Sequence, residues 1–222
     1  MPYGAAKNAL TTIKMMYQGE PENPAIGIPR PKPNKPKSEI GATPWTPQAL
    51  RAYRETHKPG TMAHLTLTLF MFTACRISDA TVLGRGNQFE RNGETWIGWQ
   101  PSKRGSAYVE IPLLPPLLKA TRAQKIVGPT YILTEYGTPH RSPEGLRNRF
   151  KKWCTQAGLE NMSSHGIRKA VGKLLAEEGC SQYQIMAVHG HTDSKTSSVY
   201  TQGAERSRLA GEAAKILEAM EW

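Results

Sequence analysis

Residues 87–113, NQFERNGETWIGWQPSKRGSAYVEIPL, decide the fold class of this chain. Apolar and polar residues alternate along the stretch, which is the period of a β-strand with one buried face. Asn92-Gly93 is typical of a tight hairpin turn, and a second turn is expected around Lys103-Arg104-Gly105-Ser106, before a third strand over 107–112. The stretch therefore predicts a small antiparallel sheet of three strands.

Helical patterns lie on both sides of this predicted sheet. Thr46 followed by Pro47 is typical of a helix start, because a capping threonine accepts a backbone N–H and proline fits the first turn. Residues 60–74 are apolar enough for a helix at the centre of the core. Further helices are expected over 115–124, 142–158, 164–179, 181–189, 194–202 and 204–221. The predicted fold class is α+β, a mostly helical domain with a small antiparallel three-stranded sheet.

The first 44 residues differ in composition from the rest of the chain. Seven of the 17 prolines fall within residues 1–36, and such a segment neither continues a helix nor lies in a central strand. We expect a Pro/Lys-rich extended linker there, preceded by a short helix over 5–17. That helix is either the last one of a preceding domain or one docked on the main domain, which is expected over 45–222.

The charge balance indicates the class of partner. The sequence has 29 Lys and Arg against 18 Asp and Glu, a net charge of +11. This excess favours a polyanion, with nucleic acid first and an anionic membrane surface second, over a merely soluble basic protein. The longest apolar stretch, 65–75, is about half a membrane span, so no membrane attachment is expected. Three widely spaced cysteines, Cys75, Cys154 and Cys180, fit reduced thiols in the cytoplasm.

Two basic residues adjoin segments predicted to be ordered. Arg76 follows the apolar stretch directly, with Asp79 three residues later. Because an isolated buried charge is very costly, Arg76 must either pair with Asp79 or bind an anion. Lys103, at the second turn of the sheet, is either solvated or placed to reach into a groove.

Residues 141–173 form a basic segment with only two acidic residues, Glu144 and Glu160. His165 and Arg168 lie three positions apart at the start of a predicted helix, which Ser163 or Ser164 can cap and whose N–H groups add anion affinity. The segment is either a solvated basic face or a surface that binds the DNA backbone. The candidate DNA-contacting residues are Arg141, Arg147, Arg149, Lys151, Lys152 and Lys169.

Residues 189–200, HGHTDSKTSSVY, allow three interpretations. A metal site of His165, His189 and His191 is disfavoured, since no carboxylate or cysteine accompanies them at ligand spacing. Tyr200 is then either a core residue or a nucleophile. Cleaving a phosphodiester without metal requires cations on the non-bridging oxygens, a nucleophile and an acid for the leaving oxygen. Arginine suits the first task because its guanidinium matches phosphate oxygens in bidentate fashion.

The order of these residues resembles the catalytic pattern of the tyrosine recombinase (phage integrase) family. The pattern consists of Arg76, Lys103, His165-x-x-Arg168, Gly190-His191 and Tyr200, with His191 and Tyr200 nine positions apart as in this family. The resemblance covers residues 45–205, so 45–222 is interpreted as the catalytic domain with a C-terminal helix. Residues 1–44 resemble the end of the family's core-binding domain, truncated here, with its linker.

The resemblance implies a covalent mechanism. Tyr200 attacks the scissile phosphate to give a 3′-phosphotyrosyl link and a free 5′-hydroxyl, while Arg76 and Arg168 hold the non-bridging oxygens. Because the phosphotyrosine conserves the bond energy, no metal, ATP or other cofactor is expected.

The remaining residues of the pattern have supporting roles by the same resemblance. Lys103 protonates the leaving oxygen, His165 assists as general base, His191 hydrogen-bonds the phosphate, and Asp79 orients the others. The family often has glutamate in place of Asp79.

Two further departures are an alanine at 74, where glycine is common, and His189, where leucine is common; neither removes a catalytic group. The last helix, with apolar residues at Leu209, Ala213, Ile216, Leu217 and Met220, resembles a tail that relatives dock onto a neighbouring subunit. The alternative is that this helix packs on its own domain.

The sequence thus predicts a site-specific DNA recombinase that integrates or excises a mobile element. The expected partner is double-stranded DNA, bound by a homotetramer that is a monomer without DNA, in the bacterial cytoplasm. The alternatives are DNA relaxation of the type IB topoisomerase kind and a non-catalytic DNA-binding protein. The latter is disfavoured because binding alone does not require Tyr200 nine residues after His191.

Overall fold

The computed structural model describes residues 3–32, 41–125 and 127–218, in two units that divide after Gly41. In the first unit α1 (Tyr3–Met16) forms where the sequence predicts a helix, and Leu10 is its buried residue. Turns follow around residues 17–27. Residues 33–40, the most lysine-rich part of the predicted linker, lie outside the described residues.

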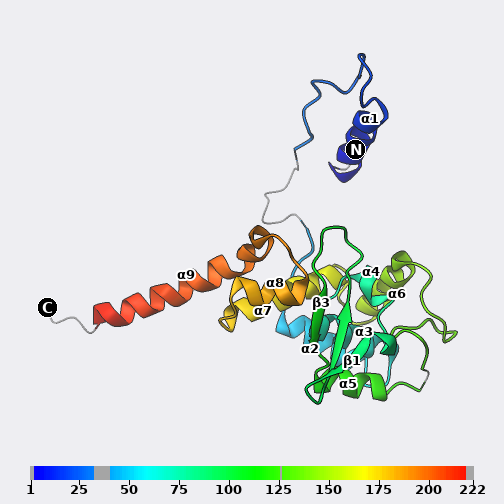
Figure 1. The fold of residues 1–222 in the computed structure, drawn as a ribbon, viewed down its shortest axis with the longest axis vertical. Helices are drawn as coiled ribbons and strands as arrows, with labels where there is room; N and C mark the ends of the chain where they lie inside the picture. The colour runs from blue at the N-terminus through cyan, green and yellow to red at the C-terminus, as the bar shows by residue number, and fades with distance from the viewer. Residues whose placement is uncertain (1–2, 33–40, 126, 219–222) are drawn as a thin grey trace. The chain divides into compact units, whose positions relative to one another are not determined.

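The second unit contains the predicted sheet (Figure 1). Strands β1 (Gln88–Arg91), β2 (Glu94–Trp99) and β3 (Val109–Pro112) pair antiparallel in the order β1-β2-β3. Asn92 and Gly93 both have positive φ, 52° and 78°, as the tight turn between β1 and β2 requires. The register places Arg91 opposite Glu94 and Trp99 opposite Val109, so the prediction from residues 87–113 is confirmed.

Helices make up the rest of this unit, and the fold class is α+β as predicted. Two short elements, α4 and the 3₁₀-helix η2, were not expected, because three or four residues are too few for a periodic pattern. Ser142, Ser163 and Ser181 cap their helices through side-chain oxygens, as Thr46 does. The elements are α2 (Pro47–Thr56), α3 (Met62–Thr73), α4 (Ile77–Ala80), η2 (Arg85–Asn87), α5 (Pro115–Arg122), α6 (Pro143–Gln156), α7 (Ser164–Glu177), α8 (Gln182–His189) and α9 (Ser194–Glu218).

The prediction of two separate helices after residue 193 is wrong. Residues 194–218 form the single helix α9, which continues through Gly203. A glycine inside a helix costs only about 1 kcal/mol relative to alanine, and no proline here interrupts the backbone hydrogen bonds. Ala213 and Ile216 of the expected apolar stripe are exposed. The side chains of Leu209 and Leu217, and Met220 as a whole, lie outside what the structure describes.

Helix α3 is the centre of the core, as its composition predicts. Its leucines and Phe70 are buried on all sides, so its hydroxyl groups must find partners inside the helix. Thr66, Thr68 and Thr73 each donate to the backbone carbonyl four residues earlier, at 2.7 to 2.8 Å. Phe150 of α6 packs edge-on against Phe70, with ring centroids 5.5 Å apart, and so joins the two helices.

Candidate active site

Arg76 lies at the sharp turn between α3 and α4. Ala74 ends α3 in the left-handed conformation, with φ 48°, which glycine adopts more easily than alanine. The backbone N–H of Arg76 then donates to Asp79 Oδ2 at 3.2 Å. The expected alternative, an ion pair between these two side chains, does not occur, and Nη1 of Arg76 is buried without a hydrogen-bond partner among the described residues. Such a donor is suited to an anion.

Asp79 connects this turn to the loop that carries Lys103. Its Oδ1 accepts hydrogen bonds from the backbone N–H and the hydroxyl of Ser102, both at 2.9 Å. Asp79 is buried, and Lys103 follows Ser102 directly. The carboxylate therefore orients two of the predicted site residues through backbone contacts, although 23 positions separate it from Ser102.

Arg168 is the most buried cation of the site, only 4% exposed. Its two terminal nitrogens donate to the carbonyl oxygens of Ala74 and His189, and Nη2 also lies 3.0 Å from His191 Nε2. Burial first, and then the positive charge of Arg76, lowers the pKa of Arg168 to about 10, so the guanidinium still carries its charge at neutral pH. Arg168 is thus held rigidly on α7 by backbone carbonyls.

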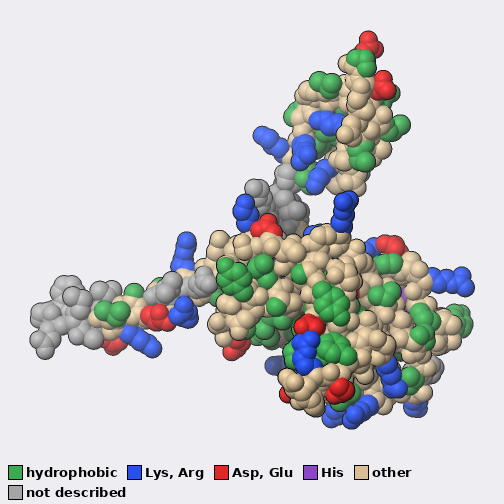
Figure 2. Space-filling view, in the orientation of Figure 1, with side chains coloured by type: hydrophobic (Ala, Val, Ile, Leu, Met, Phe, Trp, Pro, Cys, Tyr) green, Lys and Arg blue, Asp and Glu red, His purple; other side chains and the backbone are tan. Residues whose placement is uncertain are grey.

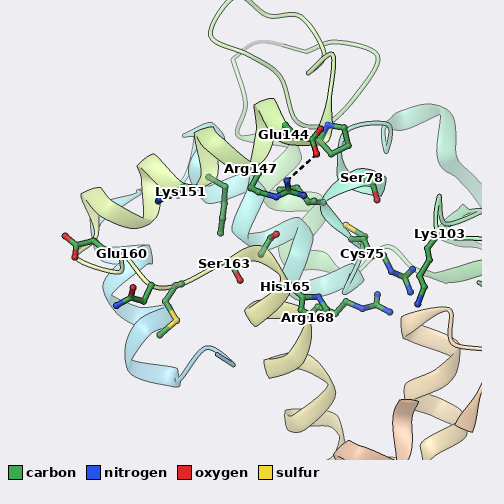
Figure 3. A pocket seen from close by; sticks show the side chains of 17 residues that line it. Cys75, Ser78, Lys103, Glu144, Arg147, Lys151, Glu160, Ser163, His165 and Arg168 are labelled. Atoms are coloured by element: carbon green, nitrogen blue, oxygen red, sulfur yellow. Dashed lines mark hydrogen bonds and ion pairs between the residues drawn. The ribbon is translucent and has the colours of Figure 1, made fainter. Parts of the chain in front are cut away.

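Four of the predicted site residues line one cavity of about 800 Å³: Arg76, Lys103, His165 and Arg168. Figure 3 shows Lys103 and Arg168 with their charged ends facing the same part of this cavity. Loss of solvent, followed by the charges of Lys169, Arg168 and Arg76, lowers the pKa of His165. The imidazole is therefore neutral at pH 7 and can accept a proton.

Tyr200 is not among the residues that line this cavity; its ring packs against α7 one turn after Arg168. Gly172, one turn after Arg168, leaves the space that the tyrosine ring fills; a Cβ there would come within 3.0 Å of Tyr200 Cε2 and 2.8 Å of His189 Cε1. Burial raises the pKa of Tyr200, and the charge of Arg168 acts in the opposite direction. The phenol is neutral here, so a base must take its proton before it can attack.

His189 packs against the ring of Tyr200. Its ring is fully buried, and it meets the rings of His191 and Tyr200 edge-on, with centroids 5.1 and 5.7 Å away. Both ring nitrogens lack hydrogen-bond partners among the described residues. Burial first, then the charge of Arg168, lowers the pKa of His189 to about 2. In this arrangement His189 is a neutral packing residue and does not reach the surface to contact DNA.

The candidate DNA-contacting residues divide into two groups. Arg147 and Lys151, one turn apart on α6, line the cavity, and Arg147 pairs with Glu144 at 3.2 Å. The other four, Arg141, Arg149, Lys152 and Lys169, are not among its lining residues. Arg149 instead pairs with Glu135 at 3.2 Å and lies over the ring of Trp153. Lys and Arg side chains occur at several places on the second unit in the face drawn in Figure 2.

Sequence reasoning missed three residues of the site: Ser102, Gly172 and Ser197. Ser197 is fully buried, and its Oγ lies 2.8 Å from His191 Nδ1. Gly172 carried a signal, because an isolated glycine within a helical pattern often marks a close contact. The serines carried none, since nothing local distinguishes them from solvated neighbours.

Two further observations concern metals and membranes. In the described ranges, no three His, Cys, Asp or Glu side chains are grouped so as to hold a metal ion. None of the helices that the structure describes combines the length and the apolar character that a bilayer crossing requires.

The fold resembles that of several solved DNA-bound proteins. A lambda integrase dimer bound to a COC′ core site matches with a TM-score of 0.69 and 17% identity over 90% of this chain and 59% of that one. XerH site-specific recombinase bound to a palindromic difH substrate matches with a TM-score of 0.56 and 20% identity, covering 79% and 53%. Tn1549 transposon integrase in complex with circular intermediate DNA matches at 0.67 and 14%, covering 94% and 79%. The chain thus spans less than two thirds of the first two.

Sequence comparison gives the family. No curated protein matches the chain. The sequence model of the Phage integrase family matches residues 46–206, which is well over half of the chain. This range includes all seven predicted catalytic residues. With that match, the chain belongs to the phage integrase family.

Proposed function

We propose that this protein is a site-specific DNA recombinase, an integrase that cleaves and rejoins DNA through a 3′-phosphotyrosyl intermediate to integrate or excise a mobile element. The observation that carries the proposal is the cavity that Arg76, Lys103, His165 and Arg168 line, together with the packing of Tyr200 against the next turn of α7 after Arg168. Neither arginine pairs with a carboxylate among the described residues, so both retain donors for an anion.

In the first step, the Tyr200 oxygen attacks the scissile phosphorus while His165 takes the phenol proton. Arg76 and Arg168 stabilise the charge that develops on the two non-bridging oxygens. The bond from phosphorus to the 5′ oxygen breaks, and Lys103 supplies the proton that makes the 5′-hydroxyl. His191 adds a hydrogen bond to the phosphate.

Rejoining reverses these transfers. A 5′-hydroxyl attacks the phosphotyrosyl phosphorus, Lys103 recovers a proton, and the Tyr200 oxygen leaves with the proton that His165 returns. The number of phosphodiester bonds is unchanged, so strand exchange needs no external energy source.

The partner we propose is double-stranded DNA, bound in the bacterial cytoplasm by a homotetramer that forms on the recombination sites. The DNA complexes of lambda integrase, XerH and Tn1549 integrase support DNA as the ligand. Residues 1–44 are proposed to be the end of a core-binding domain with its linker, which would hold the far side of the duplex. Cavity residues Arg147 and Lys151 are proposed to contact the backbone next to the scissile phosphate.

The experiment uses a pool of nicked duplexes of randomised sequence, in which cleavage releases a short strand and traps the covalent adduct. Adducts that resist detergent are recovered and their DNA is sequenced. We expect adducts with the wild type and with Tyr183→Phe, a matched control because Tyr183 is 69% exposed on α8. Tyr200→Phe should form none. Equal trapping by Tyr200→Phe and wild type would overturn the assignment, and plasmid relaxation without exchange between two recovered sites would favour a topoisomerase.

A further inference from the structure

His191 is held between two partners of different chemistry. Its Nε2 lies 3.0 Å from Arg168 Nη2, and its Nδ1 lies 2.8 Å from Ser197 Oγ. A guanidinium has only N–H donors, so Nε2 must be the acceptor and carries no proton. The proton of the neutral ring is then on Nδ1 and is donated to Ser197 Oγ. The lowered pKa of His191, about 4, agrees with a neutral ring; its first cause is burial.

This protonation state is the opposite of the one that binding a phosphate requires. Phosphate oxygens only accept hydrogen bonds, so His191 can contact one through Nε2 only when that nitrogen carries a proton. The proton must therefore leave Nδ1, or a second proton must arrive, when DNA replaces the contact with Arg168. In the first case Nδ1 becomes an acceptor, and in the second it remains a donor.

Ser197 is suited to both cases. A serine hydroxyl donates as well as accepts, so it satisfies Nδ1 in either form by rotating about its C–O bond. Ser197 is fully buried, and the contact with His191 is the one hydrogen bond that its Oγ makes among the described residues.

The position of Ser197 also connects His191 to the nucleophile. Ser197 lies three residues before Tyr200 on α9, so the two side chains share a helix face. The ring of Tyr200 packs over Gly172 and against His189, and His189 also contacts the ring of His191. The hydrogen bond to His191 thus holds the first turns of α9 where the tyrosine ring is seated.

We propose that Ser197 is a positioning residue, whose hydroxyl accommodates both protonation states of His191 and aligns the Tyr200 helix with the phosphate-binding side chains. The contact itself is independent of the function proposed above. Its consequence for strand cleavage rests on that function.

The test compares Ser197→Thr with Ser197→Val. Both replacements add one branch at the buried site and have nearly the same shape, so they differ only in keeping or losing the hydroxyl. Ser198→Ala is the control, because the Ser198 hydroxyl donates to the carbonyl of Lys195 at 3.1 Å and does not contact the site. Thermal unfolding checks that all variants are folded.

The first readout is the Nδ1–H proton resonance of His191 in the DNA-free protein, measured by NMR with its exchange rate against water. We expect a slowly exchanging proton on Nδ1 in the wild type, Ser198→Ala and Ser197→Thr. In Ser197→Val the proton lacks an acceptor, and its exchange should be at least about tenfold faster. An unchanged exchange rate in Ser197→Val would contradict the proposed hydrogen bond.

The second readout is the single-turnover rate of adduct formation on the recovered duplex at saturating protein, together with the affinity for the same DNA. We expect Ser197→Val to cleave about tenfold more slowly than Ser197→Thr, because valine removes one hydrogen bond. The DNA affinities of the two variants should agree within about twofold, because neither replacement removes a contact with DNA. Equal cleavage rates for these two variants would overturn the positioning role. Failure of the proposed function looks different, because the wild type itself would then form no Tyr200-dependent adduct while the proton resonance still reports the contact.

Discussion

Replacing Gly172 by alanine changes the packing of Tyr200 without removing any hydrogen-bonding group. The added Cβ would lie 2.8 Å from His189 Cε1 and 3.0 Å from Tyr200 Cε2, whereas ordinary contacts begin at 3.4 Å. Ordinary contacts would therefore require the tyrosine ring to recede by about 0.4 Å and the buried histidine ring by about 0.6 Å, or α7 to shift by a similar amount. Gly172 thus sets how closely the tyrosine ring approaches α7.

Two opposing terms determine the stability of Gly172→Ala. Alanine is favoured over glycine inside a helix by about 1 kcal/mol, while overpacking a core typically costs about 1–3 kcal/mol. We expect a net loss of about 0–2 kcal/mol in the free energy of unfolding, measured with urea. Gly211→Ala is the matched control, since Gly211 lies in α9 with open space around its Cα and should gain up to about 1 kcal/mol.

A separate loss is expected in the rate of DNA cleavage. A displacement of about 1 Å at a reacting group can cost about a hundredfold in rate, so a shift of about 0.4 Å predicts a loss of roughly tenfold. The assay is single-turnover adduct formation on the recovered nicked duplex, with Gly211→Ala expected at the wild-type rate. If Gly172→Ala cleaves as fast as Gly211→Ala, the packing of Tyr200 against Gly172 does not control the cleavage rate.

Three more outcomes are expected. His189 stays neutral in the folded state, whereas in the unfolded chain it binds a proton below its ordinary pKa of about 6.5, so the free energy of unfolding falls as the pH drops. Between pH 6.5 and 4.5, the wild type should lose about 2 kcal/mol more of this free energy than His189→Leu, measured by urea unfolding. Asp79→Asn places an amide N–H₂ against the Arg76 backbone N–H and should cost about 1–3 kcal/mol of stability and slow adduct formation, while unchanged values for both would refute the connecting role of the carboxylate. Lys151→Ala should lower the salt dependence of DNA binding, measured by fluorescence anisotropy, by about one released counterion. Lys152 is not among the cavity-lining residues, so Lys152→Ala should lower the salt dependence by a smaller amount. A larger decrease for Lys152→Ala than for Lys151→Ala would argue against the cavity as the DNA site.

The elements of the second unit could be predicted because their signals are local. The Asn92-Gly93 turn and the alternation around it specify a hairpin by backbone conformation alone, and Thr46-Pro47 specifies a helix start in the same way. The break expected near residue 203 was wrong because a glycine weakens a helix without ending it, and whether the helix continues depends on what its flanking turns pack against. The α4 turn was missed because its capping depends on one carboxylate, that of Asp79.

From the sequence alone we could identify the chemistry-bearing residues, their order and most of the helices and loops that carry them, but neither the short helix of Asp79 nor the full length of the Tyr200 helix. Which of these residues contact one another depends on the folded structure. Asp79 with Ser102, Gly172 with Tyr200 and Ser197 with His191 are pairings of ordinary residues that come together because α4, α7, α9 and the sheet pack around one core. Local sequence patterns report backbone preference and the buried face of an element, whereas contacts between distant side chains depend on how those faces dock.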